Sequence, residues 1–269
     1  MSLRTGISEI NDFIGFNYDS IFELKHMYFG YFTSPWVPIV SVSLYLILSK
    51  TVFSTIRSVF NLQPKGTIVQ QLTILHSTIL ALYSIWTFLS SVPIVYNHII
   101  ENGFWETLCD ANGSLWFNKD FGFWLTHFYI SKYYEFIDTW IVLLKGRDPI
   151  FLQVFHHAGI VILMWGFVVT TNTVGLVIVC FNSFIHSLMY TYYLFAAMGY
   201  HSPLKHYLTM AQIIQFLLGM TLTLPTLFMS GCLSPAQSLV LWITEGYTVV
   251  LIALFLMFYA SAYTKKKKT

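Results

Sequence analysis

Apolar stretches of about twenty residues recur along the chain, and a stretch of this length can cross the hydrocarbon core of a bilayer as an α-helix. There are seven such stretches, at residues 35–54, 68–92, 121–144, 150–170, 173–198, 206–229 and 236–262. Only 10% of the 269 residues are charged, whereas soluble domains carry about 25%. We therefore expect an all-α integral membrane protein with seven transmembrane helices, forming a single domain over residues 1–269.

The distribution of Lys and Arg predicts the orientation, because cytoplasmic loops collect these residues. Most of them follow the first, third and fifth predicted helices or lie in the tail: Lys50, Arg57, Lys65, Lys145, Arg147, Lys205 and the four lysines at 265–268. Arg4, Lys25 and Lys119 fall on the other side. This split predicts a lumenal N-terminal segment, residues 1–34, and a cytosolic basic tail, residues 263–269.

The expected lumenal loops contain two features that agree with this orientation. Asn112 begins an Asn-Gly-Ser glycosylation sequon, although a tripeptide can also match by chance. Cys109 and Cys232 share the oxidising side, where a disulfide between them can form. Cys180 lies within a predicted helix and is interpreted as a packing residue.

The basic tail resembles a targeting signal. Its last residues, KKKT, are similar to the dilysine signal that retrieves membrane proteins to the endoplasmic reticulum. A charged tail that only fixes the orientation is the simpler interpretation, and the two are compatible. We expect a multi-pass protein of the endoplasmic reticulum membrane.

Ionisable residues interrupt the third predicted helix, although a charge at the centre of a membrane helix costs about 2.5–3.5 kcal/mol on insertion scales. Its segment SKYYEFIDTW contains Lys132, Glu135, Asp138 and Thr139. At about 100° per residue, Lys132, Glu135 and Thr139 share one face, and Asp138 flanks it. These charges are expected to pair, either as a structural network between helices or as part of a site.

The fourth predicted helix has three polar residues on one face. Gln153, His156 and His157 stand at positions i, i+3 and i+4 and therefore point the same way. A lone His in a helix is usually a satisfied core residue, but two adjacent His residues beside a Gln favour a functional site.

The fifth and sixth helices add further polar residues. In the fifth helix they share or flank one face: Asn182, His186, Met189, Tyr190 and Tyr193. The sixth helix begins with Thr209, Gln212 and Gln215. Met189 and Tyr193 could be packing residues, and His76 in the second helix is either a site residue or a helix–helix hydrogen bond.

In the predicted orientation these polar groups lie in one slab toward the cytosol. His156 and His157 are about 9–11 Å from the start of their helix at 1.5 Å per residue. The sequence thus predicts one buried site that opens to the cytosol, with three basic residues at its mouth: Lys145, Arg147 and Lys205. These three would meet a phosphorylated ligand, or they simply follow the positive-inside rule.

Histidine chemistry without metal is the expected mode of action. Four histidines remain inside the helices once loop and boundary residues are set aside: His76, His156, His157 and His186. They are too few for a membrane di-iron centre, although their number alone leaves a single-metal site open. We expect no metal and no cofactor, because imidazole itself provides a nucleophile or a general acid or base near pH 7.

Four segments together resemble the signature boxes of the ELO family of fatty-acid elongases: KYYEFIDTW, QVFHH, NSFIHSLMYTYY and TMAQIIQ, in order between residues 132 and 215. The resemblance implies seven helices, six of which enclose a narrow tunnel for the acyl chain. It implies the condensation of long-chain acyl-CoA with malonyl-CoA to 3-oxoacyl-CoA, CO2 and CoA. The implied partners are these two CoA esters, the bilayer, and the reductases and dehydratase of the cycle. A homodimer stays open, and no nucleic-acid partner is expected.

The resemblance also suggests roles for individual residues. We expect His156 to take the acyl group as an acyl-imidazole, with His157 as the alternative nucleophile or as a base. Asn182 and His186 would stabilise the developing oxyanion. The expected substrate-binding residues are Lys132, Glu135, Asp138, Thr139, Gln153, Met189, Tyr190, Tyr193, Gln212 and Gln215.

The first position of the histidine box departs from the family's commonest pattern, HxxHH, because it is Gln153. Gln cannot act as a base, so this residue is expected to orient a neighbour or the substrate by hydrogen bonds. A Gln-first box resembles members that extend polyunsaturated chains. Chain length would depend on the residues that close the lumenal end of the tunnel, for which Phe228, Trp242 and Tyr247 are candidates.

A seven-helix receptor or a small transporter would share this topology. A receptor predicts a ligand site on the lumenal side, whereas the polar slab lies toward the cytosol. A transporter usually contains internal repeats, and the sequence shows none. An enzyme is therefore the favoured interpretation.

Overall fold

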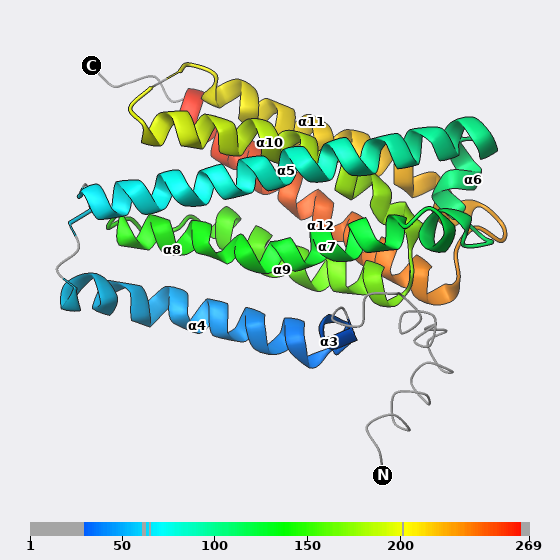
Figure 1. Ribbon diagram of the computed structural model, residues 1–269, viewed down its shortest axis with the longest axis horizontal. Helices are drawn as coiled ribbons and strands as arrows, with labels where there is room; N and C mark the ends of the chain where they lie inside the picture. Colours follow the sequence, from blue (N-terminus) through cyan, green and yellow to red (C-terminus); the bar gives the residue numbers. More distant parts are fainter. Residues whose placement is uncertain (1–29, 61–62, 65, 201, 265–269) are drawn as a thin grey trace, which may run out of the picture.

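The computed structural model describes residues 30–60, 63–64, 66–200 and 202–264, and all regular elements in these ranges are helices (Figure 1). The side chains of residues 50–54, 56–57 and 264 are outside this description. Several predictions fall on residues that are not described: the N-terminal segment up to residue 29, the lysine tail, and the side chains of Lys50, Arg57 and Lys65.

The helices follow one another along the chain with short connections. Their order is α3 Gly30–Thr33, α4 Trp36–Val59, α5 Thr67–Asn102, α6 Phe104–Cys109, η2 Ser114–Asn118, α7 Phe121–Tyr134, α8 Phe136–Leu144, α9 Phe151–Val169, η3 Thr173–Gly175, α10 Leu176–Ala197, α11 Lys205–Thr223, η4 Leu224–Phe228, α12 Pro235–Tyr259 and η5 Ala260–Thr264.

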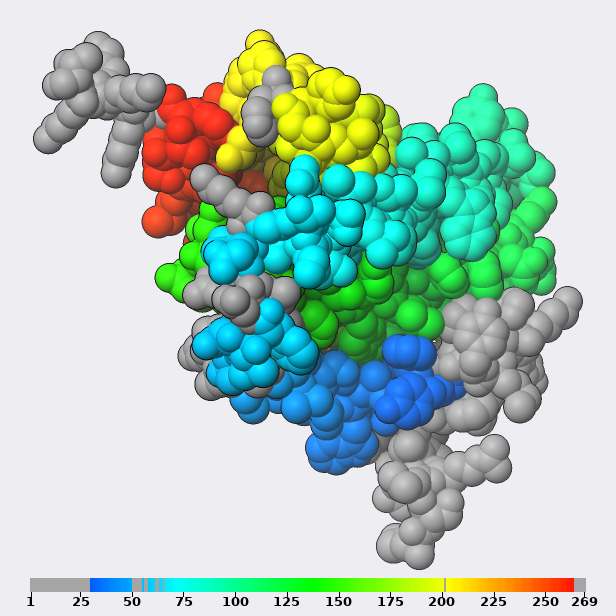
Figure 2. Space-filling model, turned by 60° about the vertical axis from the view of Figure 1, so that its left-hand side comes forward, coloured from blue at the N-terminus to red at the C-terminus, as the bar shows by residue number. Residues whose placement is uncertain are grey.

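The long helices lie side by side and form a closed ring. α5 packs along α10, α10 contacts α11, α11 contacts α12, and α12 contacts α9. α9 contacts α7, and the pair α7 and α8 returns to α5. α4 lies outside the ring against α8 and α9, at the lower edge of Figure 1. In Figure 2, where α4 is blue and α5 is cyan, the green surface of the middle of the chain separates the two helices.

Five helical stretches are long and apolar enough to cross a membrane, judged by length and composition: Thr67–Asn102, Phe151–Val169, Thr173–Ala197, Lys205–Phe228 and Pro235–Tyr263. Trp36–Ser49 is a shorter apolar helix. Many large apolar side chains of these helices are exposed, for example Leu82, Leu89 and Met257, as expected for residues that face lipid. Several apolar helices of this kind indicate a multi-pass membrane protein.

Three of the helices differ from their predicted bounds, and the first is α4, which continues five residues past the predicted end to Val59. α5 continues past Pro93 to Asn102, although proline lacks the N–H that a helix interior needs; membrane helices tolerate such a residue when neighbouring groups satisfy the backbone. The third predicted helix is divided at Glu135 into α7 and α8. There the N–H of Asp138 bonds to the Glu135 carbonyl three residues earlier, so the backbone makes a turn between the two helices.

The end of the bundle near α6 is fastened by a disulfide and by a buried carboxylate. Cys109 and Cys232 are bonded, as the sequence predicts, and they join α6 to the segment before α12. Asp110 adopts a left-handed conformation, and its carboxylate accepts hydrogen bonds of 2.9 Å from the N–H groups of Leu115 and Trp116. Asn112 is exposed in the intervening turn, so its glycosylation stays a prediction.

Candidate active site

Two cavities meet inside the ring of helices. The outer cavity, of about 450 Å³, lies between α5, α8, α9, α10 and α11 and is lined by many polar residues. The inner cavity, of about 80 Å³, lies between α9, α10, α11 and α12 and is lined mainly by apolar residues. Four residues line both cavities: His156, Asn182, Gln215 and Phe216. If a ligand had a polar head in the outer cavity and an apolar chain in the inner cavity, these four residues would contact it where the head joins the chain.

A buried ion pair lies behind this junction. Lys132 and Glu135 are each 2% exposed. Nζ of Lys132 donates to Oε1 of Glu135 over 2.6 Å and to Oδ1 of Asn182 over 2.9 Å. The same Nζ lies 3.9 Å from the centre of the Phe128 ring. These contacts stabilise charges that would be strongly unfavourable inside the bundle if they were unpaired.

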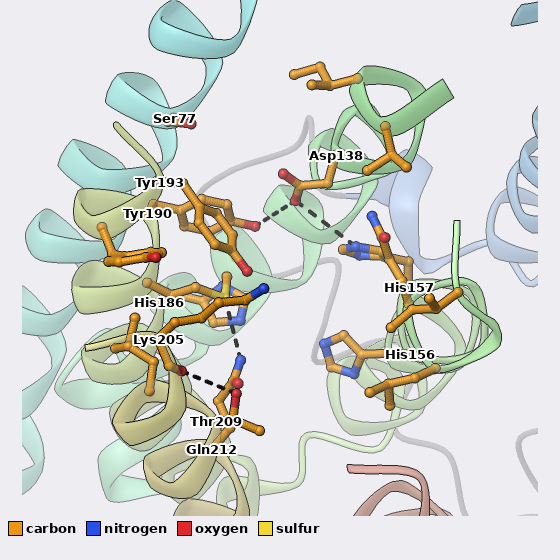
Figure 3. A pocket seen from close by; sticks show the side chains of 18 of the residues that line it. Ser77, Asp138, His156, His157, His186, Tyr190, Tyr193, Lys205, Thr209 and Gln212 are labelled. Atoms are coloured by element: carbon orange, nitrogen blue, oxygen red, sulfur yellow. Dashed lines mark hydrogen bonds and ion pairs between the residues drawn. The ribbon is translucent and has the colours of Figure 1, made fainter. Parts of the chain in front are cut away.

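His157 lies between two carboxylates. Its Nδ1 is 4.0 Å from Oε2 of Glu135, and its Nε2 is 4.0 Å from Oδ2 of Asp138. His186 also approaches Glu135, with 3.4 Å between its Nδ1 and Oε1. Figure 3 shows His156 and His157 extending from α9 toward His186 and Tyr190 of α10. Both distances exceed a hydrogen bond, so the two carboxylates act on His157 through their charge and would stabilise a positive charge that its ring gains on accepting a proton.

Asp138 is shared by three helices. Its Oδ1 lies 2.9 Å from Nε2 of His76 in α5, and its Oδ2 accepts a 2.7 Å hydrogen bond from the Tyr190 hydroxyl in α10. Asp138 and His76 both line the outer cavity. Because a carboxylate that accepts two hydrogen bonds has a restricted orientation, Asp138 presents a defined negative charge to His157.

His156 has a different environment from its neighbour. It has no carboxylate within 4.0 Å among the described residues, which distinguishes it from His157, whereas its Nδ1 is buried without a hydrogen-bond partner there as that of His157 is. Its Nε2 is thus the ring nitrogen that remains available to a ligand. The backbone carbonyl of His156 accepts a 3.0 Å hydrogen bond from the Tyr247 hydroxyl of α12, which fixes this turn of α9.

Gln153 is held through a chain of hydrogen bonds that leads out to α4. Its Nε2 donates to the Thr139 hydroxyl over 3.3 Å, and that hydroxyl lies 2.8 Å from the hydroxyl of Tyr45. Gln153 also lines the outer cavity, and its orienting role stays a prediction.

α11 forms the opposite wall. Nε2 of Gln212 donates to Sδ of Met189 over 3.4 Å, a contact drawn in Figure 3. Gln215 is 8% exposed, and its Oε1 is buried without a partner in the described part of the chain. A buried amide oxygen of this kind is available to a donor on a ligand.

The three predicted basic residues line the outer cavity: Lys145, Arg147 and Lys205. Figure 2 turns their end of the bundle toward the reader, with the start of α5 in cyan, the region between α10 and α11 in yellow and the end of α12 in red. Partial burial, followed by the nearby charge of Arg147, lowers the pKa of Lys145. A bound anion would counteract both effects, so the position suits a phosphate group.

Most of the predicted site residues line the outer cavity, but three lie behind it. These three are Lys132, Glu135 and Thr139, and each contacts residues that do line the cavity. Lys132 contacts Asn182, Glu135 lies near His157 and His186, and Thr139 contacts Gln153. The structure adds polar residues to the predicted site: Thr73, Ser77, Tyr192 and His76, for which the sequence leaves a place in the site open. His76 carried a usable signal, since it is an ionisable residue within an apolar helix.

The prediction that three aromatic residues close the lumenal end of a tunnel is wrong for two of them, Phe228 and Trp242. Phe228 is 72% exposed and Trp242 is 52% exposed. Their rings contact one another on the outside of the bundle, because both side chains lie on outward faces. Tyr247 lines the inner cavity but contacts the His156 carbonyl, so it lies near the junction.

Among residues 30–60, 63–64, 66–200 and 202–264, no group of three His, Cys, Asp or Glu side chains is arranged to hold a metal ion. The arrangement at the junction is one of imidazoles, carboxylates and amides around a cavity. Such groups can carry out nucleophilic and acid–base chemistry.

Comparison with known proteins identifies the family of the chain. Residues 31–269 match the model of the ELO family, described as the GNS1/SUR4 family. The fatty acid elongase sre1 of Dictyostelium discoideum is 37% identical over 160 residues, which are 58% of this chain and 58% of that protein. A putative fatty acid elongase of the same organism is 34% identical over 210 residues, 75% of this chain and 67% of that protein.

A third relative comes from a different lineage. Fatty acid elongase 1 of Trypanosoma cruzi is 30% identical over 160 residues, 58% of this chain and 55% of that protein. The matched segment therefore spans little more than half of the length of two of these three relatives. The family model covers nearly the whole of the described chain, and the chain belongs to the ELO family.

Proposed function

We propose that this protein is a fatty-acid elongase that condenses long-chain acyl-CoA with malonyl-CoA to 3-oxoacyl-CoA, CO2 and CoA. The observation that carries the proposal is the position of His156, which lines both the polar outer cavity and the apolar inner cavity. An acyl-CoA has its reactive thioester at the boundary between a polar and an apolar part. A nucleophile at the junction of the two cavities therefore meets that thioester.

The two ends of the substrate have matching surroundings. The CoA phosphates lie at the mouth, near Lys145, Arg147 and Lys205, and the acyl chain extends along the apolar residues of the inner cavity. The inner cavity is narrow, which suits a flexible hydrocarbon chain better than a bulky ligand. This placement gives the enclosing helices the function of an acyl-chain tunnel.

The chemistry proceeds in two steps. Nε2 of neutral His156 attacks the thioester carbon, and the CoA thiolate leaves with the electron pair of the broken C–S bond, so that an acyl-imidazole forms in its cationic form, with the proton kept on Nδ1. Malonyl-CoA then loses CO2, and the released electron pair forms the new C–C bond to the acyl carbon while His156 leaves. The thiolate takes a proton from solvent at the mouth.

Asn182 is positioned to stabilise the oxyanion of both steps. Lys132 donates to its Oδ1, which directs the amide NH2 group away from Lys132. Asn182 lines both cavities, as His156 does. A donor that is already oriented needs little reorganisation when charge develops on the carbonyl oxygen. His186, held beside Glu135, is the second donor.

The carboxylates determine the different roles of the two adjacent histidines. His157 lies 4.0 Å from both Glu135 and Asp138, whose charges stabilise its ring once it has accepted a proton, so it acts as the acid–base partner. His156 has no such neighbour among the described residues and stays neutral, which is the form that a nucleophile requires. We infer that His157 stabilises the leaving thiolate or the malonyl carboxylate.

The Gln153 box supports an extension of the proposal to polyunsaturated acyl-CoA as the preferred primer. The distribution of basic residues supports the endoplasmic reticulum membrane, with a lumenal N-terminus and a cytosolic C-terminus, so that both CoA esters enter from the cytosol. The 3-oxoacyl-CoA product requires reductases and a dehydratase to complete a cycle, and these enzymes are the proposed partners. Membership of the ELO family does not favour a receptor or transporter.

A microsomal assay with radiolabelled malonyl-CoA tests the proposal. Saturated, monounsaturated and polyunsaturated acyl-CoAs are supplied to wild type, His156→Ala and His206→Ala; His206 is a histidine of α11 that lies outside both cavities. Two-carbon extension by wild type and His206→Ala, with loss in His156→Ala, is expected. Activity of folded His156→Ala at the wild-type level would contradict the assignment, and no incorporation by folded wild type would contradict the enzyme itself.

A further inference from the structure

The inner cavity contains one feature that the condensation chemistry does not use, the carboxyl group of Glu245. Glu245 lies in α12, is 5% exposed and lines the inner cavity. The surrounding lining is mostly apolar and includes Leu163, Phe167 and Leu241. A carboxyl group is an unfavourable neighbour for a hydrocarbon chain, because its lost hydration must be replaced by hydrogen bonds.

Only one half of this carboxyl group has a partner. The Thr223 hydroxyl of α11 lies 2.5 Å from Oε1 of Glu245 and also 2.9 Å from the carbonyl of Gly219. A hydroxyl has only one proton to donate. When Thr223 donates it to the Gly219 carbonyl, the contact with Oε1 is a hydrogen bond only if the carboxyl group of Glu245 is protonated and donates to Thr223. No described residue forms a hydrogen bond with the second oxygen, Oε2, and Oε2 is not among the fully buried unpartnered atoms, so it is accessible from the cavity that Glu245 lines.

The carboxyl group lies partway along the inner cavity. α12 runs antiparallel to α9, since Tyr247 contacts His156 and Gly159 whereas Val240 contacts Gly166. Glu245 is two residues beyond Tyr247 in the direction away from the mouth. Leu241, which also lines the cavity, lies about 6 Å further along at 1.5 Å per residue. An acyl chain therefore reaches Glu245 before it reaches the end of the cavity.

We propose that Glu245, held by Thr223, is a specificity-determining residue that excludes acyl chains long enough to pass it. This inference rests on the proposed elongase function. A chain that ends before Glu245 leaves Oε2 hydrated, whereas a longer chain places methylene groups against it and leaves it without any hydrogen bond. Such an unsatisfied buried group lowers the specificity constant for the longer chain by about fivefold or more.

The test is the elongation of a series of acyl-CoAs of increasing length, within the unsaturation class that wild type elongates best. Wild type is expected to show a drop in kcat/KM at one length. Glu245→Leu replaces the carboxyl group by an apolar side chain of similar size and should raise kcat/KM beyond that length by about fivefold or more, with shorter chains unaffected. Glu245→Gln keeps the hydrogen-bonding group and should keep the drop.

Two threonine variants complete the test. Thr223→Val leaves both carboxyl oxygens without a partner and should deepen the drop, the opposite direction to Glu245→Leu. Thr221→Val is the matched control, because Thr221 also lies in α11 and donates to a carbonyl of its own helix, that of Leu218, but lines neither cavity, so the length profile should not move. The Thr223 result keeps the inference testable if Glu245→Leu does not fold.

The outcomes separate this inference from the proposed function. Suppose that wild type is active. If Glu245→Leu then has the same length profile as wild type, or if Thr223→Val lowers kcat/KM equally at all chain lengths, the role of Glu245 is overturned and the proposed function is not. A folded wild type that extends no acyl-CoA overturns the proposed function first.

Discussion

Lys132 of α7 donates a 2.9 Å hydrogen bond to Oδ1 of Asn182 in α10, and both residues are almost fully buried. The contact joins the first and third of the family's boxes across fifty positions of sequence. It also links the ion pair with Glu135 to an amide that lines both cavities. Stability and the orientation of Asn182 therefore depend on the same ammonium group.

Replacing Lys132 by Met is expected to destabilise the fold by about 3–5 kcal/mol, because it leaves Glu135 charged, buried and without its 2.6 Å partner. Thermal unfolding in detergent measures the change. The control is Lys119→Met, which removes an exposed ion pair with Glu101 and should cost about 0–1 kcal/mol. Equal effects of the two substitutions would contradict the structural role of the buried pair.

The mouth residues should affect substrate binding more than the chemical steps. Lys145→Glu together with Lys205→Glu is expected to raise the KM for acyl-CoA by about tenfold or more and to leave kcat within a few-fold, because two attractive charges near the CoA phosphates become repulsive. Raised ionic strength should weaken wild-type binding as well. A Lys119→Glu variant, changed far from the cavity, should retain the wild-type KM; a fall in kcat alone would argue against a binding role.

The length of the apolar runs and the four boxes predicted the helix positions and most of the polar residues that line the outer cavity, because both signals are local in the sequence. The pairing of Asp138 with His76 could not be predicted in the same way, since it depends on how α5 is rotated against α8. The position of Lys132, Glu135 and Thr139 behind the cavity has a similar cause. For Thr139 there is a further cause, because the turn at Glu135 changes the direction of the side chains that follow it, whereas the sequence predicts a continuous helix.

Glu245 shows a different limit of the sequence interpretation. A single Glu in an apolar helix signals a special position, but neither its partner nor its cavity can be read from the local pattern. Thr223 lies on another helix, 22 residues earlier. The exposed positions of Phe228 and Trp242 were mispredicted for a related reason, because aromatic residues near a helix end can face either the interior or the lipid.

The disulfide is expected to contribute about 2–4 kcal/mol, since it closes a loop of more than a hundred residues. Reduction of wild type should lower its unfolding temperature, and Cys109→Ser/Cys232→Ser should start at that lower value and not respond to reductant. Cys180 is not part of the disulfide, so Cys180→Ser should keep the response to reductant. A double-serine variant as stable as oxidised wild type would contradict the prediction.

The packing of Gly159 against Tyr247 provides a test of how precisely His156 must be held. A Cβ atom at Gly159 would lie 2.3 Å from Cε2 of Tyr247, so Gly159→Ala must displace the ring whose hydroxyl bonds to the His156 carbonyl. We expect a loss of about 1–3 kcal/mol in stability from overpacking and a fall in kcat of about tenfold or more, since small misplacements of reacting groups are costly. Gly246→Ala in α12 is the matched control, because a Cβ atom at this position would have no atom within 4 Å. If Gly159→Ala keeps the wild-type kcat, as Gly246→Ala should, the position of this turn of α9 does not limit the reaction. That result would contradict the idea that Tyr247 holds His156 in place as the nucleophile.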